Sequence, residues 1–75
     1  MTLTTVLDAY ILTLTTVKAA TRTRYRYHAR EAVRHYGRGD ARWNRVDYAT
    51  LVANIPAEDA STLSVVRRTL AWMGV

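Results

Sequence analysis

The sequence predicts an all-α domain built as a four-helix bundle. Apolar residues recur at helical spacing in successive segments, which is the periodicity of amphipathic helices. Residues that favour helix caps or helix ends, mainly Thr, Asp, Ser and Gly, lie between those segments. The chain has 75 residues and no cysteine, so we expect one small domain without disulfide bonds.

The first helix is expected at about residues 3–15. Its apolar stripe consists of Leu3, Val6, Leu7, Tyr10, Ile11 and Leu14. Either Thr2 or Thr5 is suited to cap its first turn, because a threonine hydroxyl can accept a hydrogen bond from a free backbone N–H. Further threonines at positions 13, 15 and 16 favour an end to the helix, because β-branched residues suit a helix interior poorly.

The second helix is expected at about residues 19–36, although residues 21–27 taken alone alternate Thr or Tyr with Arg as a strand would. Over a longer window the apolar positions follow a helical face instead. These positions are Tyr25, Ala29, Ala32, Val33 and Tyr36. Gly37 follows directly, where a glycine can adopt the left-handed conformation that ends many helices.

Two shorter helices complete the predicted bundle, at about residues 48–54 and 62–73. Asp47 is expected to cap the first of them, and either Ser61 or Thr62 the second. The remaining core contacts are expected from Trp43, Val46, Leu51, Val52, Val65, Val66, Thr69, Leu70, Trp72 and Met73. All four helices would thus bury one apolar side, as the members of a bundle do.

The basic residues are concentrated in one part of the chain. Nine of the eleven lie between Lys18 and Arg45, a span that holds only two acids and so carries a net charge of +7. The whole chain has a net charge of only +5, so the rest of the molecule is slightly acidic. A cationic segment this dense suits a polyanion, and double-stranded DNA is the partner that we expect.

The candidate DNA-binding residues lie on the second and fourth predicted helices. At about 100° per residue, Arg26, Arg30 and Arg34 fall on one flank of the second helix. The full set is Thr21, Arg22, Thr23, Arg24, Arg26, Tyr27, Arg30, Arg34, Ser64, Arg67 and Arg68. Arginine can bind phosphates or guanine edges through two hydrogen bonds at once, and hydroxyl groups add contacts to the phosphate backbone.

The residues give catalysis no support. There is no pair of acids with a supporting base, no glycine-rich phosphate loop of the right spacing and no nucleophile elbow. His28 and His35 are seven residues apart, but two ligands do not make a zinc site. We therefore expect no catalytic residue, no metal, no cofactor and no small-molecule substrate.

The sequence shows neither a secretory signal nor a membrane span. The first basic residue is Lys18, which is late for a signal, and no cleavage motif follows it. No stretch approaches the roughly 18 uncharged apolar residues that a span requires. The expected location is therefore the cytoplasm, without membrane contact.

Three short motifs, spread over nearly the whole chain, resemble one known family. The segment from Lys18 to Tyr25 is similar to a turn that opens a helix, with a tyrosine four residues after a threonine and basic residues beyond it. Residues 43–47, after Gly37, resemble a hydrophobic step and a capped helix, and residues 61–68 resemble the opening of a last helix. The family is that of tyrosine recombinases and phage integrases, whose N-terminal core-binding domain carries such motifs. Its two turn prolines are replaced here by Ala19 and Thr62.

The resemblance implies both a fold and a role. The fold is an orthogonal, SAM-like bundle of four helices, and the role is to hold duplex DNA at the core recombination site through the second and fourth helices. In the family a separate domain carries the catalytic residues. The chain is therefore expected to lack that domain, to bind DNA and to cleave none. Contacts between protomers on DNA and a bacterial host cell are implied for the full-length protein.

Two other functions are compatible with the sequence. If residues 21–27 formed a strand, the chain would suit a dimeric repressor of the ribbon-helix-helix type, which reads the major groove with a β-ribbon. A helix ahead of that strand argues against this repressor. The bundle could instead bind an acidic surface on another protein, with Trp72 and Met73 exposed near the C-terminus.

Overall fold

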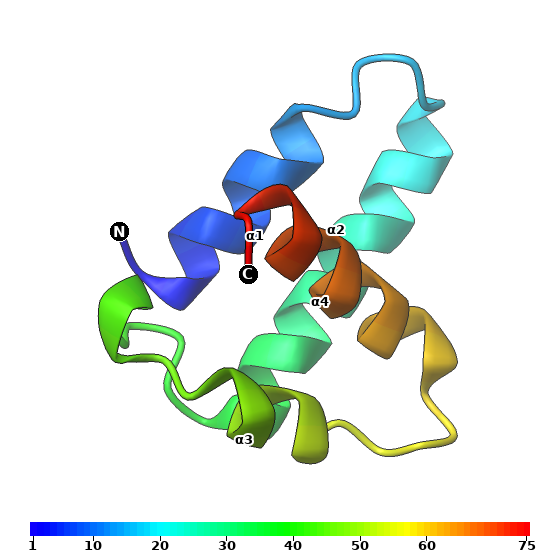
Figure 1. The fold of residues 1–75 in the computed structure, drawn as a ribbon. Helices are drawn as coiled ribbons and strands as arrows, with labels where there is room; N and C mark the ends of the chain where they lie inside the picture. The colour runs from blue at the N-terminus through cyan, green and yellow to red at the C-terminus, as the bar shows by residue number, and fades with distance from the viewer.

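Four α-helices and one short 3-10 turn make up the structure, a computed structural model that describes residues 1–75. The helices are α1 (Leu3–Leu12), α2 (Ala19–Tyr36), α3 (Tyr48–Ala53) and α4 (Ala60–Trp72), and the 3-10 turn η1 (Trp43–Arg45) precedes α3. The chain forms no β-strand, so the predicted all-α bundle is confirmed (Figure 1). None of the helices combines the length and the apolar character needed to cross a membrane.

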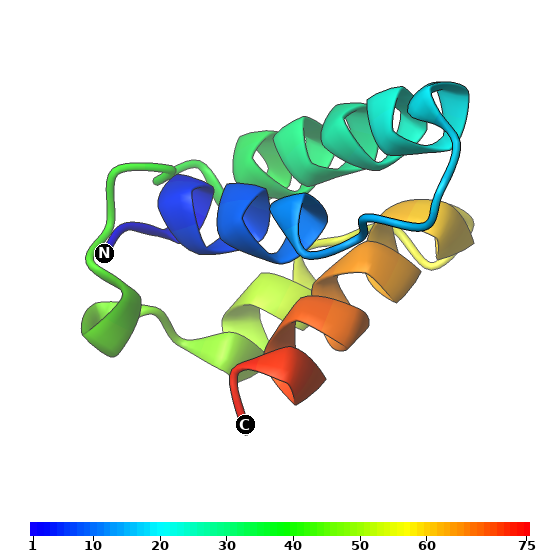
Figure 2. The same cartoon turned by 90° about the horizontal axis from the view of Figure 1, so that it is seen from above.

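The helices are arranged around α2, which is the longest of them. α1 and α2 lie side by side and run in opposite directions, and the loop 13–18 joins them (Figure 1). α3 and α4 lie below this pair in the view of Figure 2. α2 contacts each of the other three helices, and its contacts with α4 and α1 are the most extensive.

The core lies where α2 meets α1 and α4. Its buried residues are Leu3, Leu7, Ile11, Ala29, Ala32, Val46, Leu51, Ile55 and Val66. Only two residues of α2 are buried, and both are alanines, Ala29 and Ala32. Tyr25 and Tyr36 pack against this core, as their places on the apolar stripe predicted. The rest of α2 faces solvent or lines the edges of its contacts, so every arginine of this helix except Arg22 is exposed.

α1 begins as predicted but ends three residues early, at Leu12 rather than at about residue 15. The Thr2 side chain caps the first turn by accepting a hydrogen bond from the Thr5 N–H at 3.2 Å. At the other end the Thr13 hydroxyl donates to the Tyr10 carbonyl at 2.6 Å. This side-chain bond engages a carbonyl near the helix end, and the chain turns into the loop instead of continuing.

The bounds of α2 match the prediction at both ends. Residues 21–27 are helical, so the interpretation of this segment as a strand is wrong, and with it the premise of the ribbon-helix-helix repressor. Gly37 ends the helix with a φ of 80° and donates its N–H to the Val33 carbonyl. This left-handed conformation is the reason for a glycine at this position.

The loop after α2 fastens the start of α1 to the bundle. The Leu3 N–H donates to the Ala41 carbonyl at 2.9 Å, and the Thr4 N–H donates to the Gly39 carbonyl at 3.2 Å. These bonds satisfy N–H groups that the first turn of a helix otherwise leaves free. A Cβ atom on Gly39 would lie 2.5 Å from a methyl carbon of Val33, so only glycine lets the loop pass this close.

The caps of the last two helices are both aspartates. Asp47 accepts a hydrogen bond from the Thr50 N–H, as predicted, and α3 ends at Ala53, one residue before the predicted end. Asp59 accepts from the Thr62 N–H, so α4 begins at Ala60 and the expected caps Ser61 and Thr62 are wrong. A carboxylate at the position just before the helix can accept a hydrogen bond from the backbone N–H three residues later, as Asp59 does from Thr62. Ser61 and Thr62 already lie within the first turn and cannot take that position.

Both tryptophans were expected in the core, but the structure places them in different environments. Trp43 is half-buried and packs against Tyr48, with ring centroids 5.0 Å apart. Trp72 lies at the end of α4 with 43% of its surface exposed, so its interpretation as a core anchor is wrong. Its ring contacts Tyr10 of α1 from the outside, with centroids 5.8 Å apart. In the same last turn of α4, Thr69 is buried and Leu70 packs against the core, so Trp72 lies on the outer side of that turn.

Leu7→Ala and Leu12→Ala form a matched pair in α1. Leu7 is 2% exposed and Leu12 is 65% exposed. The free energy of unfolding is expected to fall by roughly 2–5 kcal/mol for Leu7→Ala, because a cavity replaces buried methyl groups. For Leu12→Ala it is expected to change by no more than about 0.5 kcal/mol. Urea unfolding measures both, and equal losses would contradict the placement of the core.

Stability is also expected to fall at acidic pH. The hydrogen bonds from Thr50 and Thr62 hold the pKa values of Asp47 and Asp59 below the ordinary range of an aspartate. A carboxyl with a lower pKa in the folded state stabilises the fold above its unfolded pKa, and that stabilisation is lost as the pH falls through the folded value. The melting temperature should therefore drop between about pH 5 and pH 2.

A variant that keeps the caps but not their charge is the control for this pH dependence. In the double variant Asp47→Ser and Asp59→Ser, the serine hydroxyls can still cap both helices but do not titrate in this range. Thermal unfolding of the variant should show a smaller drop over the same pH range. An unchanged drop would mean that other carboxyl groups carry the pH dependence.

Candidate nucleic-acid interface

Two grooves flank α2 on its exposed side, and each is lined by arginines. The groove toward α1 has a volume of about 330 Å³ and is lined by Thr4, Asp8, Leu12, Arg26 and Arg30. A smaller hollow of about 110 Å³, lined in part by Asp8 and Arg30, lies between the same two helices. Arg26 and Arg30 thus lie together, as predicted, but they share their groove with a carboxylate that the sequence did not place there.

The second groove lies between the N-terminal halves of α2 and α4. It also has a volume of about 330 Å³. The predicted site residues that line it are Thr21, Arg24, Ser64 and Arg68. Tyr25 and His28 of α2 and Ala60 and Ser61 of α4 complete the lining. The structure therefore brings together hydroxyl and guanidinium groups from two helices, although the lining residues of one helix lie more than 30 positions from those of the other in sequence.

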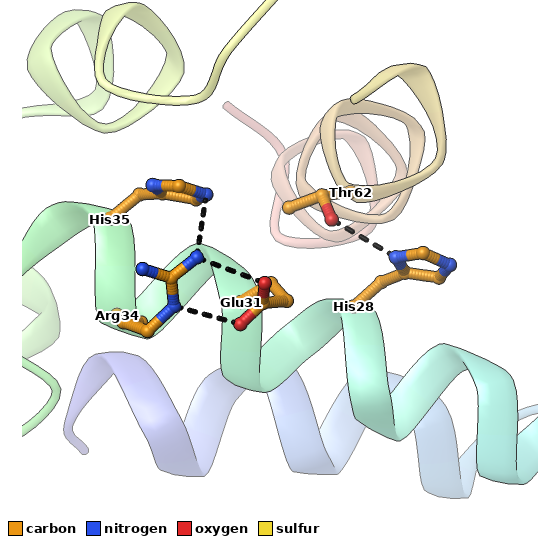
Figure 3. A network of polar contacts seen from close by, with 5 residues as sticks. All are labelled: His28, Glu31, Arg34, His35 and Thr62. Carbon is orange, nitrogen blue, oxygen red and sulfur yellow. Dashed lines mark hydrogen bonds and ion pairs between the residues drawn. The ribbon is translucent and has the colours of Figure 1, made fainter. Parts of the chain in front are cut away.

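Polar contacts fix the crossing of α2 and α4 beside this groove. His28 and Thr62 point toward each other, with Nδ1 and Oγ1 3.0 Å apart (Figure 3). Thr62 is fully buried, and its backbone N–H is bound by the cap Asp59. A second contact spans the crossing where Arg68 Nη1 donates to the Tyr25 hydroxyl at 3.2 Å. These bonds hold Arg68 and His28 in place at the edge of the groove.

Arg34 differs from the other arginines of α2 because it has an acidic partner. Its Nε and Nη2 atoms donate to the two carboxylate oxygens of Glu31 at 2.9 and 3.0 Å (Figure 3). This bond lowers the pKa of Glu31 and raises the pKa of Arg34. It is the only ion pair in the structure. Arg34 was predicted to join Arg26 and Arg30 in one cationic row, but its charge is largely balanced by this carboxylate.

Arg22 stabilises the fold and does not join the exposed arginines of α2. Its guanidinium donates from Nη2 to the Leu14 carbonyl in the loop between α1 and α2. Its Nε atom is buried and has no hydrogen-bond partner. The side chain therefore ties α2 to the preceding loop, and it is less exposed than the arginines with which it was grouped.

The other predicted site residues lie at the surface without a groove of their own. Thr23 donates its hydroxyl to the Ala19 carbonyl at 3.1 Å, which is a bond within the helix. Tyr27 is 57% exposed, and its ring meets that of His28 edge-on at 5.2 Å. Arg67 is exposed and makes no hydrogen bond. Of these three side chains, Tyr27 and Arg67 are free to meet a ligand.

Two residues near the grooves were missed by the sequence prediction. His28 was considered with His35 as an insufficient pair of zinc ligands, and its spacing from the fourth helix carries no signal of the contact with Thr62. Asp8 could not be placed beside Arg26 and Arg30 from the sequence, because the docking of α1 beside α2 cannot be inferred from α1 alone. No three His, Asp or Glu side chains gather closely enough to hold a metal ion.

Arg22→Ala and Arg24→Ala test the division between structural and exposed arginines. Arg22→Ala is expected to lower the free energy of unfolding by roughly 1–2 kcal/mol, because the bond to the loop is removed. Arg24 makes no hydrogen bond within the chain, so Arg24→Ala should change stability by no more than about 0.5 kcal/mol. Thermal and urea unfolding of the two variants measure this difference, and a more damaging Arg24→Ala would contradict the assignment.

Comparison of the chain with protein-family models, curated proteins and solved structures finds no match. A role for the protein therefore has to be inferred from the residues themselves. The features available for that inference are the unpaired arginines on α2 and α4, the two grooves beside α2, and the single carboxylate in one of them.

Proposed function

We propose that this domain binds double-stranded DNA through the exposed faces of α2 and α4. The observation that carries the proposal is the absence of acidic partners for most of the arginines on these two helices. The exposed arginines without an ion pair on α2 and α4 are Arg24, Arg26, Arg30, Arg67 and Arg68. Positive charges that the fold leaves unneutralised on one region favour a polyanionic partner.

A duplex fits these faces better than a single strand does. Proteins that hold single strands without sequence preference stack successive bases on exposed aromatic side chains. Tyr27 is the only tyrosine with most of its surface exposed, since Tyr25 and Tyr36 pack against the core. Trp72 is also exposed, but it lines neither groove beside α2. Tyr27 alone gives no platform for successive bases, so contacts to the phosphates of a duplex are the better supported mode.

The sequence motifs imply a biological setting for this DNA binding, namely site-specific recombination. A core-binding module of a phage-type tyrosine recombinase would use its second and fourth helices on duplex DNA, and the arginines described above lie on α2 and α4. We propose binding alone as the role of these residues, in the cytoplasm of a bacterial host cell. Strand cleavage would belong to a separate catalytic domain, as the resemblance implies.

A protein partner is the second candidate, and one observation favours it. Trp72 is 43% exposed beside Tyr10, at the end of α4 away from the grooves that flank α2. A partner with an acidic surface could use the arginines and this ring together. Such a partner would require no DNA binding by the isolated domain, so one titration separates the two functions.

The affinity of the domain for duplex DNA is expected to fall steeply with salt. If the five unpaired arginines of α2 and α4 each neutralise one phosphate charge, by contact or through solvent, log K should fall against log salt with a slope of roughly −4 to −5. Fluorescence anisotropy of a labelled duplex in increasing potassium chloride measures this slope. A duplex affinity without salt dependence, or no binding at low salt, would remove DNA as the partner and favour the protein-binding alternative.

A further inference from the structure

The two flanks of α2 are not equivalent, although both carry arginines. Arg26 and Arg30 line the groove toward α1, and Arg24 lines the groove toward α4 together with Arg68. The two grooves have the same volume, so they differ in the chemistry of their walls and not in size. That chemistry decides which flank can hold a phosphate closely.

The groove toward α1 contains its own anion. The Asp8 carboxylate lines it with Arg26 and Arg30, yet neither arginine forms an ion pair with it. An incoming phosphate would meet this negative charge at short range, and two like charges in one site repel each other. Leu12 adds an apolar wall that gives a phosphate no hydrogen bond. The arginines of this flank can attract DNA over a distance, but the groove is a poor binding site for a phosphate group.

The groove toward α4 has the opposite character. Its lining holds two guanidinium groups, Arg24 and Arg68, and no carboxylate. Thr21, Ser61 and Ser64 line it as well, and their hydroxyl groups can donate to phosphate oxygens. The nearby carboxylate of Asp59 is bonded to Thr62 and does not line the groove.

Hydrogen bonds also hold two of the side chains that line the groove toward α4. The Tyr25 hydroxyl holds Arg68 at 3.2 Å, so this guanidinium loses less freedom when it binds a ligand. His28 is held by Thr62 on the same wall. The groove has a volume of about 330 Å³ and is open to solvent, so a phosphate of a duplex can approach it from outside.

We infer that the groove between α2 and α4 is the anchoring site for one backbone phosphate of the bound nucleic acid, with Arg24 and Arg68 as its charged ligands. This inference rests on the proposed function and refines it. Arg26 and Arg30 then supply attraction without close contact, so equal changes of charge on the two flanks have unequal effects.

Two double variants with the same change of charge test the inference. Arg24→Gln with Arg68→Gln removes the charges beside α4, and Arg26→Gln with Arg30→Gln removes two charges beside α1. Affinity for a labelled duplex at fixed salt should fall at least about tenfold for the first pair, since charge-assisted hydrogen bonds are removed. It should fall no more than about threefold for the second pair, because its charges act through solvent. The salt slope should become shallower by about one for each phosphate that the variant no longer neutralises.

The possible outcomes separate the inference from the proposed function. Equal losses of affinity for both pairs, or a larger loss for Arg26 and Arg30, would overturn the anchoring site and leave DNA binding intact. Unchanged affinity in both double variants would overturn DNA binding through these faces and the anchoring site with it.

Single variants guard against an effect on folding. Arg68 is bonded to Tyr25, so its removal changes a contact between α2 and α4. Arg24 makes no such contact, and Arg24→Gln should weaken duplex binding by several-fold, on the order of one charge-assisted hydrogen bond. Arg26→Gln in the same helix is its control, and the two should have the same melting temperature. Equal affinities for these single variants would overturn the site.

Inorganic phosphate distinguishes a site for free phosphate from one for the nucleic-acid backbone. Phosphate added at constant ionic strength should compete with the duplex for the wild-type protein, and the Arg24 and Arg68 double variant should be insensitive to it. Binding of inorganic phosphate in the groove, with duplex affinity unaffected by the double variant, would assign the groove to the free ion and overturn the inference.

Discussion

The narrow, small-residue stripe of α2 is the constraint on which the other features depend. Within 18 residues this helix buries only Ala29 and Ala32, so it can contact α1 and α4 closely without large side chains between them. The larger apolar residues of the core come from its neighbours, such as Leu7 of α1 and Val66 of α4. A helix that buries so little of itself leaves most of its circumference for polar side chains.

That exposed circumference determines where the charge of the protein is available. A bundle of this size could neutralise its arginines with surface carboxylates, but only Glu31 does so, and it takes Arg34. Arg22 is removed from the surface by a different route, because it completes the loop between α1 and α2. The remaining arginines of α2 are divided by the docking of its neighbours. α1 brings Asp8 to one flank, and α4 brings Arg68 and two serines to the other. The same packing that makes the core therefore also gives the two flanks their different chemistry.

The sequence was sufficient for the elements whose signals are local. The bounds of α2 followed from the apolar period and from Gly37, and the cap Asp47 followed from its residue type. Where several capping residues adjoin, as at Asp59, Ser61 and Thr62, residue type alone did not decide which one caps. For the candidate site too, only the local features could be predicted from the sequence. The period of α2 placed the arginines around the helix, but the partners that α1 and α4 bring to them depend on docking, which no local pattern encodes.

Backbone amide chemical shifts of the ¹⁵N-labelled domain, followed during titration with a short duplex, test the central claim most directly. That claim is that the unpaired arginines of α2 and α4 contact DNA. The largest changes are predicted in α2 from Thr21 to Arg30 and in α4 from Ser61 to Arg68, with α3 and η1 little affected. Changes centred on α3 or η1, or no change at low salt, would contradict the account.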